Sequence, residues 1–502
     1  NINGTPKSRN SNYISQKPSE VDDLALTSQT NLNQLFFTWT TPEDLDTLPA
    51  SLSYEFRYAT KSFDTEADWN NAPGKSGLPA VGNFGGGASF SFAIEHFNQT
   101  YYFALKTKDS DNNYSDISSQ VSYAIPEAIS TSAGWPMSGF NQFHTLKTNF
   151  SGPSSATATK SWEFSVPSGT AMGQPIIAPN GTVFVGTTAG TVARLYAIAP
   201  SGSESWRYDG TSGASIGTPV ALVDNSIVFI YNSGGTVITG LNASGAVKYL
   251  TSLGAIKSLT VDKFGVSYLT TSTDKIMAVG FGGTQKWEIS PGVNLAGLSP
   301  VILNDGKAFI TSKNGGVPYF YAFDTKNGAA LWPEAKRMDH DCLCGVSDPS
   351  YDKDNDILYA AAEKYIWKIN PDGTGSEAFF ADGASGQGLT STMISINEDH
   401  ILVGIDYSIN NPASQSAVLA INKDTEEIAW SYGVDARINS QISIDNESNV
   451  YFSTQNGKVY SLDSAGELNW MIALGANTSA YPVLGEGVMY LTTNNSKLIK
   501  IE

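Results

Sequence analysis

The sequence predicts an all-β protein made of two parts, a β-sandwich followed by a β-propeller. The 502 residues include 47 Gly, 23 Tyr, 23 Phe and 10 Trp but only 16% charged residues, a composition typical of β-structure with many turns. Strand-length segments that mostly alternate apolar and polar residues lie between residues 20 and 125. A repeat then recurs about every 40 to 50 residues to the end of the chain, the length of one four-stranded propeller blade.

The first 125 residues divide into a tail and a sandwich. Residues 1–19 are polar and rich in Asn, Ser and Lys, so we expect a flexible tether. Residues 20–125 have the size of one sandwich, with turn clusters between the expected strands. These strands are predicted at 35–40, 52–59, 88–95, 100–108 and 120–125.

The segments LFFTWTTPED, SYEFRYATKSFDTEADWNNAP and TYYFALKTKDSDNNYSDIS together resemble a fibronectin type III domain of the kind found in secreted bacterial proteins. Trp39 matches the buried Trp of that family's second strand. Tyr102 matches the tyrosine-corner position, where the hydroxyl ties a connection back to the sheet. The sequence has no Arg-Gly-Asp tripeptide, so the resemblance gives no support for integrin binding.

Eight copies of one repeat occupy the chain from about residue 157 onward. Each copy begins with an apolar strand, passes through a turn containing Asn, Asp or Gly, and continues into a second β-rich strand. The copies lie at 175–187, 219–231, 258–270, 300–312, 349–361, 393–405, 441–453 and 481–493.

A second element follows most copies and consists of a strand, a tight polar turn and a strand with a large aromatic residue. We expect the aromatic residue to fill the space between neighbouring blades. Tyr249 takes the Trp position in the second blade, and the fifth blade is degenerate there. The Trp residues are Trp206, Trp287, Trp332, Trp430 and Trp470.

The eighth repeat ends without an aromatic fourth strand. Residues 160–166, which include Trp162, are predicted to supply that strand from the N-terminal side and so to close the ring. Closure removes the exposed edges that an open array would present. The count therefore predicts an eight-bladed propeller closed by an N-terminal strand.

These segments resemble the PQQ-like β-propeller repeat, whose pattern is Y-x-L-D-x-x-T-G-x-x-x-W. The family includes quinoprotein dehydrogenases and the outer-membrane assembly scaffold lipoprotein of Gram-negative bacteria. Residues 134–156 are similar to the lead-in before the first blade of many such proteins, with Trp135 as its first aromatic residue. We therefore assign 134–502 to the propeller, expect the lead-in to pack on it, and place the hinge at 126–133.

The net charge of −18 is spread along the chain, with no acidic tail. Such a surface disfavours nucleic acids and anionic membranes, because phosphate binding needs clustered Lys and Arg. No apolar run approaches the roughly 20 residues of a transmembrane helix. Residues 1–20 lack the apolar stretch of a signal peptide, so the sequence is either that of a cytosolic protein or that of a processed or trimmed chain.

The densest group of metal-binding residue types is RMDHDCLCG at 337–345. Thiolate and imidazole suit zinc or copper, although one Cys-x-Cys pair with one His is a weak signature. Three interpretations stay open: a surface loop, a disulfide between the two cysteines, and a metal site. The residues concerned are Asp339, His340, Cys342 and Cys344.

Two acidic turns carry enough oxygen ligands to suggest calcium, but neither matches an EF-hand loop, and turn chemistry alone explains both. One contains Asp352, Asp354 and Asp356, and the other contains Asp109, Asp111 and Asn113. The remaining histidines lie outside any nucleophile, metalloprotease or phosphate-loop motif, and they are His96, His144 and His400.

Both modules resemble parts of exported proteins, and we expect no catalytic activity. We expect an extracytoplasmic binding or scaffold module, adhesin-like or active in envelope assembly, whose propeller loops recognise a protein or a surface glycan. The polar tail suits an N-terminal lipid or fibre anchor. No cofactor is expected apart from calcium at the acidic turns.

The alternative that the PQQ-like resemblance implies is a PQQ- or metal-dependent oxidoreductase, with PQQ stacked on a Trp, calcium beside it and an Asp base in the channel. The sequence lacks the adjacent Cys pair of the family's alcohol dehydrogenases and any Cys-x-x-Cys-His haem site. PQQ is therefore not expected, and a shared fold alone does not establish this activity.

Overall fold

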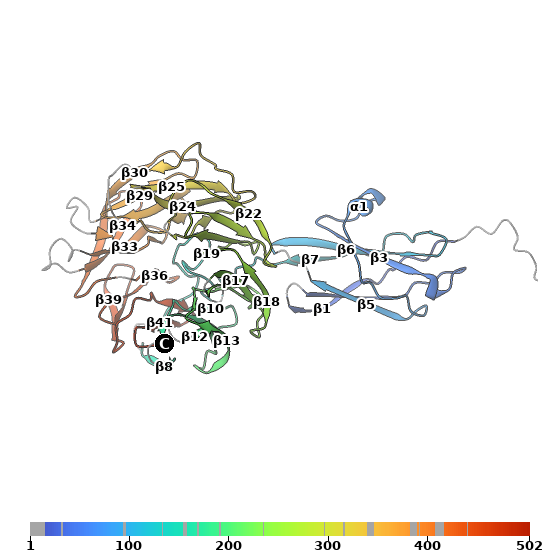
Figure 1. Ribbon diagram of the computed structural model, residues 1–502, viewed down its shortest axis with the longest axis horizontal. Helices are drawn as coiled ribbons and strands as arrows, with labels where there is room; N and C mark the ends of the chain where they lie inside the picture. Colours follow the sequence, from blue (N-terminus) through green and yellow to red (C-terminus); the bar gives the residue numbers. More distant parts are fainter. Residues whose placement is uncertain are drawn as a thin grey trace, which may run out of the picture. The chain divides into compact units, whose positions relative to one another are not determined.

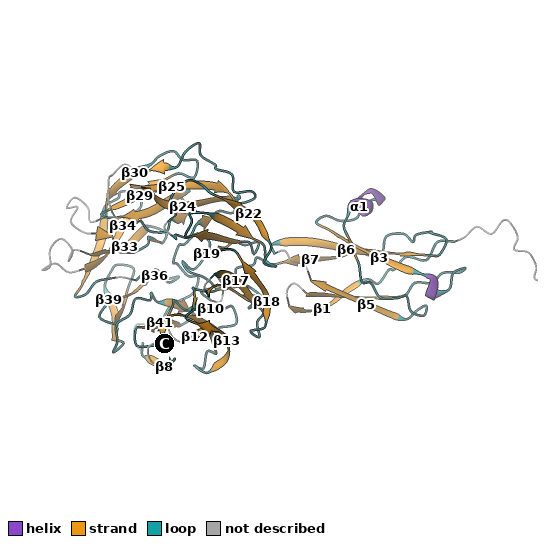
Figure 2. Ribbon diagram, in the orientation of Figure 1, coloured by secondary structure: helices purple, strands orange, loops and turns teal. Residues whose placement is uncertain are grey.

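In the computed structural model, β-strands are the main regular structure of the described residues, and helices are few and short (Figures 1 and 2). Its helices are the six-residue α1 (Glu66–Asn71) and the 3-10 turn η1 (Pro49–Ser51), and neither is long and apolar enough to cross a membrane. The chain divides into two compact units, Asn1–Glu127 and Ala128–Glu502. The described residues are 16–31, 34–93, 97–132, 134–153, 158–167, 170–189, 192–233, 235–295, 297–314, 317–338, 346–381, 389–390, 392–406, 416–438 and 440–502.

The first unit contains seven strands in two antiparallel sheets, with orders β1-β2-β5 and β4-β3-β6-β7. The all-β prediction holds for this unit, and its assignment to the fibronectin type III family stays a prediction. The strands are β1 (Ala25–Asn31), β2 (Gln34–Thr40), β3 (Ser53–Ala59), β4 (Gly74–Lys75), β5 (Gly87–Ala93), β6 (Gln99–Lys108) and β7 (Val121–Ile125).

Aromatic side chains fill the space between these two sheets. The ring of Phe37 on β2 lies 5.0 Å from that of Phe56 on β3 and 4.8 Å from that of Phe103 on β6. Trp39 is buried and meets Tyr54 edge-on at 5.1 Å. Alternate residues of a strand point to opposite faces, so the apolar residues of each strand reach one shared core.

Tyr102, predicted to form the tyrosine corner, lies on the other face of β6. It packs against the small cluster of Phe63 and Trp69, whereas Tyr101 is buried beside Phe103 in the inter-sheet core. Two consecutive tyrosines occur in TYYF, and strand alternation allows only one to face the core. The corner role of Tyr102 stays a prediction.

Residues 16–19 belong to the sandwich, which corrects the tether predicted for 1–19. The Gln16 N–H donates to Asp46 Oδ2 at 2.8 Å, and the Ser19 N–H donates to the Glu43 carbonyl at 2.9 Å. These contacts use backbone groups, so the polar composition of the segment gave no sign of them. Residues 1–15 lie outside the described part of the chain.

The second unit contains eight sheets, which we number 1 to 8 in chain order. The strands of sheet 1 are β9 (Ala171–Met172), β10 (Ile176–Ile177), β11 (Val183–Ala189), β12 (Val192–Ile198) and β13 (Glu204–Ser212). Sheet 2 contains β14 (Ser215–Ile216), β15 (Val220–Ala221), β16 (Ile227–Asn232), β17 (Thr236–Leu241) and β18 (Val247–Ser252). Sheet 3 contains β19 (Ile256–Val261), β20 (Ser267–Thr271), β21 (Ile276–Val279) and β22 (Gln285–Ile289). Sheet 4 contains β23 (Val301–Ile302), β24 (Lys307–Asn314), β25 (Val317–Asp324) and β26 (Lys336–Arg337).

The other four sheets follow the same antiparallel order. Sheet 5 contains β27 (Ser350–Asp352), β28 (Ile357–Ala362), β29 (Tyr365–Ile369) and β30 (Glu377–Phe380). Sheet 6 contains β31 (Leu389–Thr390), β32 (Ser395–Ile396), β33 (His400–Asp406), β34 (Ser416–Asn422) and β35 (Ile428–Val434). Sheet 7 contains β36 (Ser443–Ile444), β37 (Val450–Ser453), β38 (Lys458–Leu462) and β39 (Leu468–Ala473). Sheet 8 contains β40 (Val483–Gly485), β41 (Val488–Thr493), β42 (Lys497–Ile501) and β8 (Lys160–Ser165).

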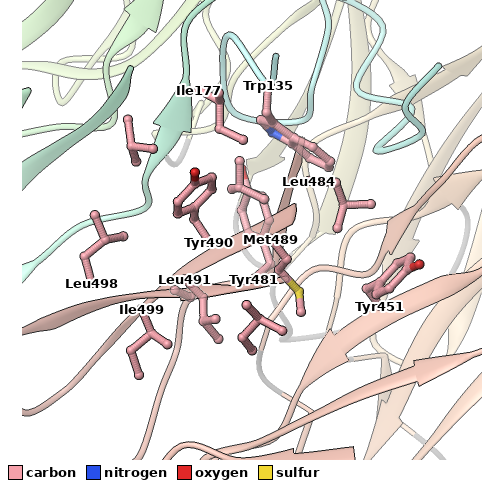
Figure 3. Packing of buried hydrophobic residues seen from close by; sticks show 14 of the residues in the cluster. Trp135, Ile177, Tyr451, Tyr481, Leu484, Met489, Tyr490, Leu491, Leu498 and Ile499 are labelled. Carbon is pink, nitrogen blue, oxygen red and sulfur yellow. The ribbon is translucent and has the colours of Figure 1, made fainter. Parts of the chain in front are cut away.

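Sheet 8 closes the ring from both sides of the sequence, as predicted for residues 160–166. Strand β8 pairs antiparallel with β42, with Trp162 opposite Lys500. Thr492 Oγ1 then donates to the Gly173 carbonyl next to sheet 1 at 3.0 Å. The buried cluster at this closure combines residues of both sheets with Trp135, which lies beside Ile177 (Figure 3).

At most junctions between consecutive sheets, an aromatic ring of one sheet covers a glycine in the turn between the last two strands of the next. We call these contacts glycine junctions. All six glycines have φ between 76° and 90°, a region where a Cβ is unfavourable, and a Cβ would also lie 2.5 to 2.9 Å from the neighbouring ring. The pairs are Trp162–Gly202, Trp206–Gly245, Tyr249–Gly283, Trp287–Gly328, Trp332–Gly373 and Trp430–Gly466.

Hydrogen bonds fix the five Trp rings at these junctions. Each indole Nε1 donates to a carbonyl in the turn that it covers, at 3.0 to 3.3 Å. The Gly and Trp of the repeat motif therefore do not meet within one repeat. Each pairs with its counterpart in the neighbouring sheet, so the motif encodes the contact between successive sheets.

Two junctions differ. Between sheets 5 and 6, Glu426 takes the glycine position with φ 59°, and Lys368 pairs with the Glu426 carboxylate in place of an aromatic contact. Between sheets 7 and 8, the Nε1 of Trp470 is buried without a hydrogen-bond partner among the described residues. Sheet 8 has no continuous last turn there, because its last two strands come from distant parts of the sequence.

The boundary between the two units lies between Glu127 and Ala128, inside the hinge predicted at 126–133. The Ala128 N–H donates to the Lys263 carbonyl at 2.8 Å, and the Ala128 carbonyl accepts from the Val223 N–H at 2.7 Å. Ala128 is fully buried. The small, polar composition of the segment indicated a linker, but these backbone bonds to sheets 2 and 3 make its second part a piece of the ring.

Candidate functional site at the hub of the ring

Residues 134–153, the described part of the lead-in, pass all eight sheets of the ring in order. Main-chain carbonyls of the lead-in accept N–H groups from sheets 1, 2, 4, 5, 6, 7 and 8, and the Gln142 side chain accepts one from sheet 3. The donor–acceptor pairs are Ile177–Trp135, Ala221–Pro136, Lys263–Gln142 Oε1, Ile302–Gln142, Tyr351–Phe143, Ile396–Thr145, Ile444–Leu146 and Gly487–Ser151, at 2.8 to 3.0 Å.

A segment this short reaches every sheet only if it lies near the axis of the ring, so we call it the hub. Its large side chains are buried: Trp135 and Leu146 are fully buried, and Phe140 is 2% exposed. The donors lie at or just after the ends of the first strands, so the hub segment also satisfies backbone groups that would otherwise be unpaired at that inner edge. Residues 154–156 of the predicted lead-in lie outside the described residues.

The hub backbone turns through conformations that large residues rarely adopt. Phe140, His144 and Leu146 have φ of 74°, 55° and 57°, and such bulky residues enter the left-handed region only where the surroundings enforce it. Gly139, at φ 75°, has no room for a side chain because a Cβ would lie 2.8 Å from the His144 ring. The contacts with the eight sheets therefore determine this conformation.

Three titratable side chains are associated with the hub. His144 is 2% exposed, and burial lowers its pKa to about 4, so the ring is neutral at pH 7. Its Nδ1 lies 3.1 Å from the Pro349 carbonyl, which only accepts, so Nδ1 carries the proton. Burial raises the pKa of Asp348 to about 6, and this carboxylate accepts the Ser299 N–H at 2.8 Å. Burial also raises the pKa of Tyr481, whose hydroxyl lies 3.3 Å from Ser138 Oγ.

These groups do not fit PQQ, a planar quinone that carries several carboxylates. A buried anion needs cationic partners. The buried groups at the hub are a neutral His144 and the carboxyl of Asp348, and Lys147 of the hub segment already pairs with Glu398. None of the ion pairs among the described residues involves Asp348. The Asp348 carboxylate would repel a second anion, and the lead-in already fills this end of the axis.

The two ends of the ring differ in their loops. Successive turns of an antiparallel sheet alternate between its ends, so the first turns of all eight sheets and the third turns of sheets 1 to 7 lie at the hub end. Many of these turns are short and held by an Asp or Asn side chain that accepts backbone N–H groups, as Asp262, Asp445 and Asp463 do. The opposite end carries the second turns and the connections between sheets, including 290–300 and 435–442. It is the end where loops can vary without disturbing the hub.

The turn at 352–356 already has its own cation. Asp352 is 3% exposed, and its Oδ2 accepts from Lys423 Nζ at 2.8 Å. Asp356 Oδ1 accepts the Tyr351 hydroxyl at 2.8 Å, and the Asp354 N–H donates to Asp352 Oδ1. Lys423 comes from sheet 6, and no local sequence signal links it to this turn. Calcium binding by Asp352, Asp354 and Asp356 stays a prediction.

The other predicted metal or disulfide residues, Asp339, His340, Cys342 and Cys344, lie outside the described residues, as does His96. Their zinc, copper and disulfide interpretations therefore stay predictions. His400 begins β33 after the first turn of sheet 6, and its N–H donates to Asn397 Oδ1 at 2.7 Å.

Comparison with known proteins identifies the fold of the second unit. Residues 414–502 match the family described as outer membrane protein assembly factor BamB. The crystal structure of BamB from Moraxella catarrhalis is similar, with 15% identity, a TM-score of 0.50, and coverage of 69% of this chain and 100% of that chain. No curated protein matches the sequence.

Two enzymes show a similar degree of structural likeness. The quinohemoprotein alcohol dehydrogenase ADHIIG from Pseudomonas putida HK5 has 10% identity and a TM-score of 0.54, with 74% of this chain and 80% of that chain covered. The quinohemoprotein alcohol dehydrogenase of Comamonas testosteroni has 12% identity and a TM-score of 0.54, with 74% and 81% covered. At these identities the likeness shows a shared β-propeller fold with PQQ-like repeats and leaves the activity undecided.

Proposed function

We propose that this protein is a non-catalytic binding or scaffold protein of the bacterial cell envelope. In this proposal the ring is an eight-bladed propeller with PQQ-like repeats, and the loops at the end opposite the hub recognise a protein or a surface glycan. The sandwich, as a fibronectin type III domain, acts as a spacer or a second contact. A lipid or fibre anchor before residue 16 would hold the protein at the surface.

The observation that carries this proposal is the occupied hub. A propeller that binds a cofactor on its axis needs space and charged partners there, whereas this hub is filled by buried side chains and backbone hydrogen bonds. The opposite end is free to carry recognition loops on a rigid ring, an arrangement typical of binding proteins. The match of residues 414–502 to an outer membrane assembly factor supports an envelope location.

An oxidoreductase that uses PQQ or a metal is the second candidate, because two quinohemoprotein alcohol dehydrogenases share the fold. Titration of the purified chain with PQQ in the presence of calcium distinguishes the two candidate functions. We expect no saturable change in quinone absorbance and no dye-linked oxidation of primary alcohols. Stoichiometric PQQ binding with alcohol-dependent dye reduction would contradict the binding proposal and show that the protein is an oxidoreductase.

The binding proposal is tested with matched surface variants at the two ends of the ring. Gln455→Arg and Asn494→Arg alter exposed second turns at the loop end, and Ser201→Arg and Ala465→Arg make the same charge change in exposed third turns at the hub end. Immobilised protein is used to capture partners from solubilised envelope proteins and glycans. We expect loss of a specific partner with the loop-end pair only. Equal loss with both pairs, or with the hub-end pair alone, would contradict recognition by the loop end.

A further inference from the structure

We propose that the sandwich holds a calcium ion between the loop after β2 and the turn after β6, with Asp44, Asp46 and Asp109 as ligands. The first two residues follow β2, and Asp109 follows β6 directly. Asp109 lies 65 positions after Asp44 and 63 after Asp46, so no contiguous sequence motif marks the site.

The spacing of the three carboxylates suits a calcium ion. One oxygen from each lies within 4.8 Å of the others. Two oxygens bound at about 2.4 Å on opposite sides of a calcium ion are about 4.8 Å apart, so one ion can reach all three. Carboxylates are hard ligands that calcium prefers, and water and backbone carbonyls complete its shell of about 6 to 8 oxygens.

An unpaired oxygen of Asp44 is the second observation that points to a cation. Asp44 is 7% exposed, and its Oδ2 is buried with no hydrogen-bond partner in the described part of the chain. A buried carboxylate oxygen without a donor or cation is strongly unfavourable. Its other oxygen, Oδ1, accepts the N–H groups of Asp46 and Thr47 at 2.9 and 3.0 Å. These bonds fix the carboxyl group and leave Oδ2 for a ligand.

Among the described residues, no cation pairs with this group of carboxylates. None of the ion pairs of the described residues includes Asp44, Asp46 or Asp109, and the nearby Lys17 pairs with Asp116. Burial and the neighbouring Asp46 raise the pKa of Asp44. Two close carboxylates and a third at 4% exposure therefore lack a counter-ion, and a divalent cation is the ligand that this charge distribution favours.

The turn at Asp109 is ordered before any ion binds. Asp109 Oδ1 accepts the N–H groups of Asp111 and Asn113, both at 2.8 Å, and Oδ2 accepts from Asn113 Nδ2 at 2.7 Å. Because both buried carboxylates are already held in place, binding orders little additional chain. An affinity in the range of about 10 µM to 1 mM is expected for such a surface-module site.

Calorimetric titration of the full, chelator-treated chain with CaCl2 tests the site. We expect saturable binding and a loss of at least about 10-fold in affinity with Asp46→Asn. Asp111→Asn is the matched control, because it makes the same charge change in the same turn at an exposed residue outside the group. It should stay within about 2-fold of the parent. An equal loss in both variants, or no binding up to about 10 mM, would overturn the proposal.

Asp44→Asn separates a ligand from a residue needed for folding. Without calcium, this variant should melt at or above the temperature of the parent, because it removes a buried carboxylate. Calcium should raise the melting temperature of the parent and leave that of the variant unchanged. A variant that still gains stability with calcium would place the ion elsewhere, for example at the turn with Asp352, and would overturn this assignment.

Discussion

The hub and the glycine junctions hold the same ring together in different ways. At the glycine junctions, one kind of contact is repeated between successive sheets, each with an aromatic ring over a glycine. At the hub, one segment makes a different contact with every sheet. The repeated contacts distribute the stability of the ring over many small interfaces. The hub joins all eight sheets through one segment, so damage to it affects every sheet.

Removal of the hub is expected to have the largest effect. Deletion of 134–153 removes hydrogen-bond acceptors that serve all eight sheets, together with buried aromatic side chains, so the ring should lose most of its stability or fail to fold. Thermal melting with far-UV circular dichroism measures this. Trp135→Ala gives a smaller test and should lower the free energy of unfolding of the ring by about 3 to 5 kcal/mol. A deletion variant that melts like the parent would show that the segment is only a linker.

A single glycine junction should contribute less than the hub to the stability of the ring. Gly466→Ala places a Cβ at φ 83° and 2.5 Å from the Trp430 ring, and we expect a loss of about 3 kcal/mol. Gly475→Ala is the matched control, since its φ is 81° but no atom lies within 4 Å of a Cβ there. It should lose only about 1 kcal/mol. Chemical denaturation measures the free energy of unfolding of both variants. A similar loss in the two would show that contact with the Trp430 ring is not the reason for the glycine at 466.

The hub also predicts a pH dependence that the junctions lack. The pKa of Asp348 rises from 3.8 to about 6 on folding, so the folded protein binds this proton more tightly. This contribution favours the folded state at low pH and is lost as pH rises from about 4 to about 6. Asp348→Asn should therefore gain about 2 kcal/mol relative to the parent between pH 4 and pH 7. Denaturation at both pH values tests it, and a constant difference would exclude a buried titrating carboxyl.

The atypical junction between sheets 5 and 6 should show the smallest effect. Lys368→Met removes the ion pair with Glu426, and we expect a loss of at most about 1 kcal/mol, because both groups are partly exposed. The loss should shrink further in about 1 M NaCl. Lys326→Met, at an exposed turn position, is the control. A loss as large as that of Gly466→Ala would mean that the ion pair substitutes fully for an aromatic contact.

The parts of the fold that the sequence predicts are those with local or repeated signals. Strand alternation located the sandwich, and the Trp positions marked the sheets and the closing strand with Trp162. The hub was recognised only as a segment that packs on the ring, because φ values such as that of Phe140 arise from contacts with eight separate sheets. The packing of Tyr102 against Phe63 and Trp69, on the opposite face of β6 from Tyr101, had no signal in the sequence, because composition alone does not set which face of a strand meets the core.

The candidate sites were harder to predict because their residues are distant in the sequence. Asp109 stood out in a local acidic turn, but Asp44 and Asp46 reach it only through the packing of two loops. Lys423 approaches Asp352 from another sheet, so the turn that suggested calcium also pairs with a lysine. Neither of these two contacts can be recognised from a single continuous segment of the sequence.

The pairing of the closing strand also delays the last step of folding until the end of the chain has been synthesised. Trp162 on β8 pairs opposite Lys500, which is 338 residues later in the chain. At roughly 5 to 20 residues per second, a ribosome needs roughly 20 to 70 s to produce the partner strand. During that time β8 presents an unpaired edge with Trp162 and Phe164, the kind of surface that aggregates. A chaperone or an export factor that shields this edge until the last strand arrives would prevent such aggregation.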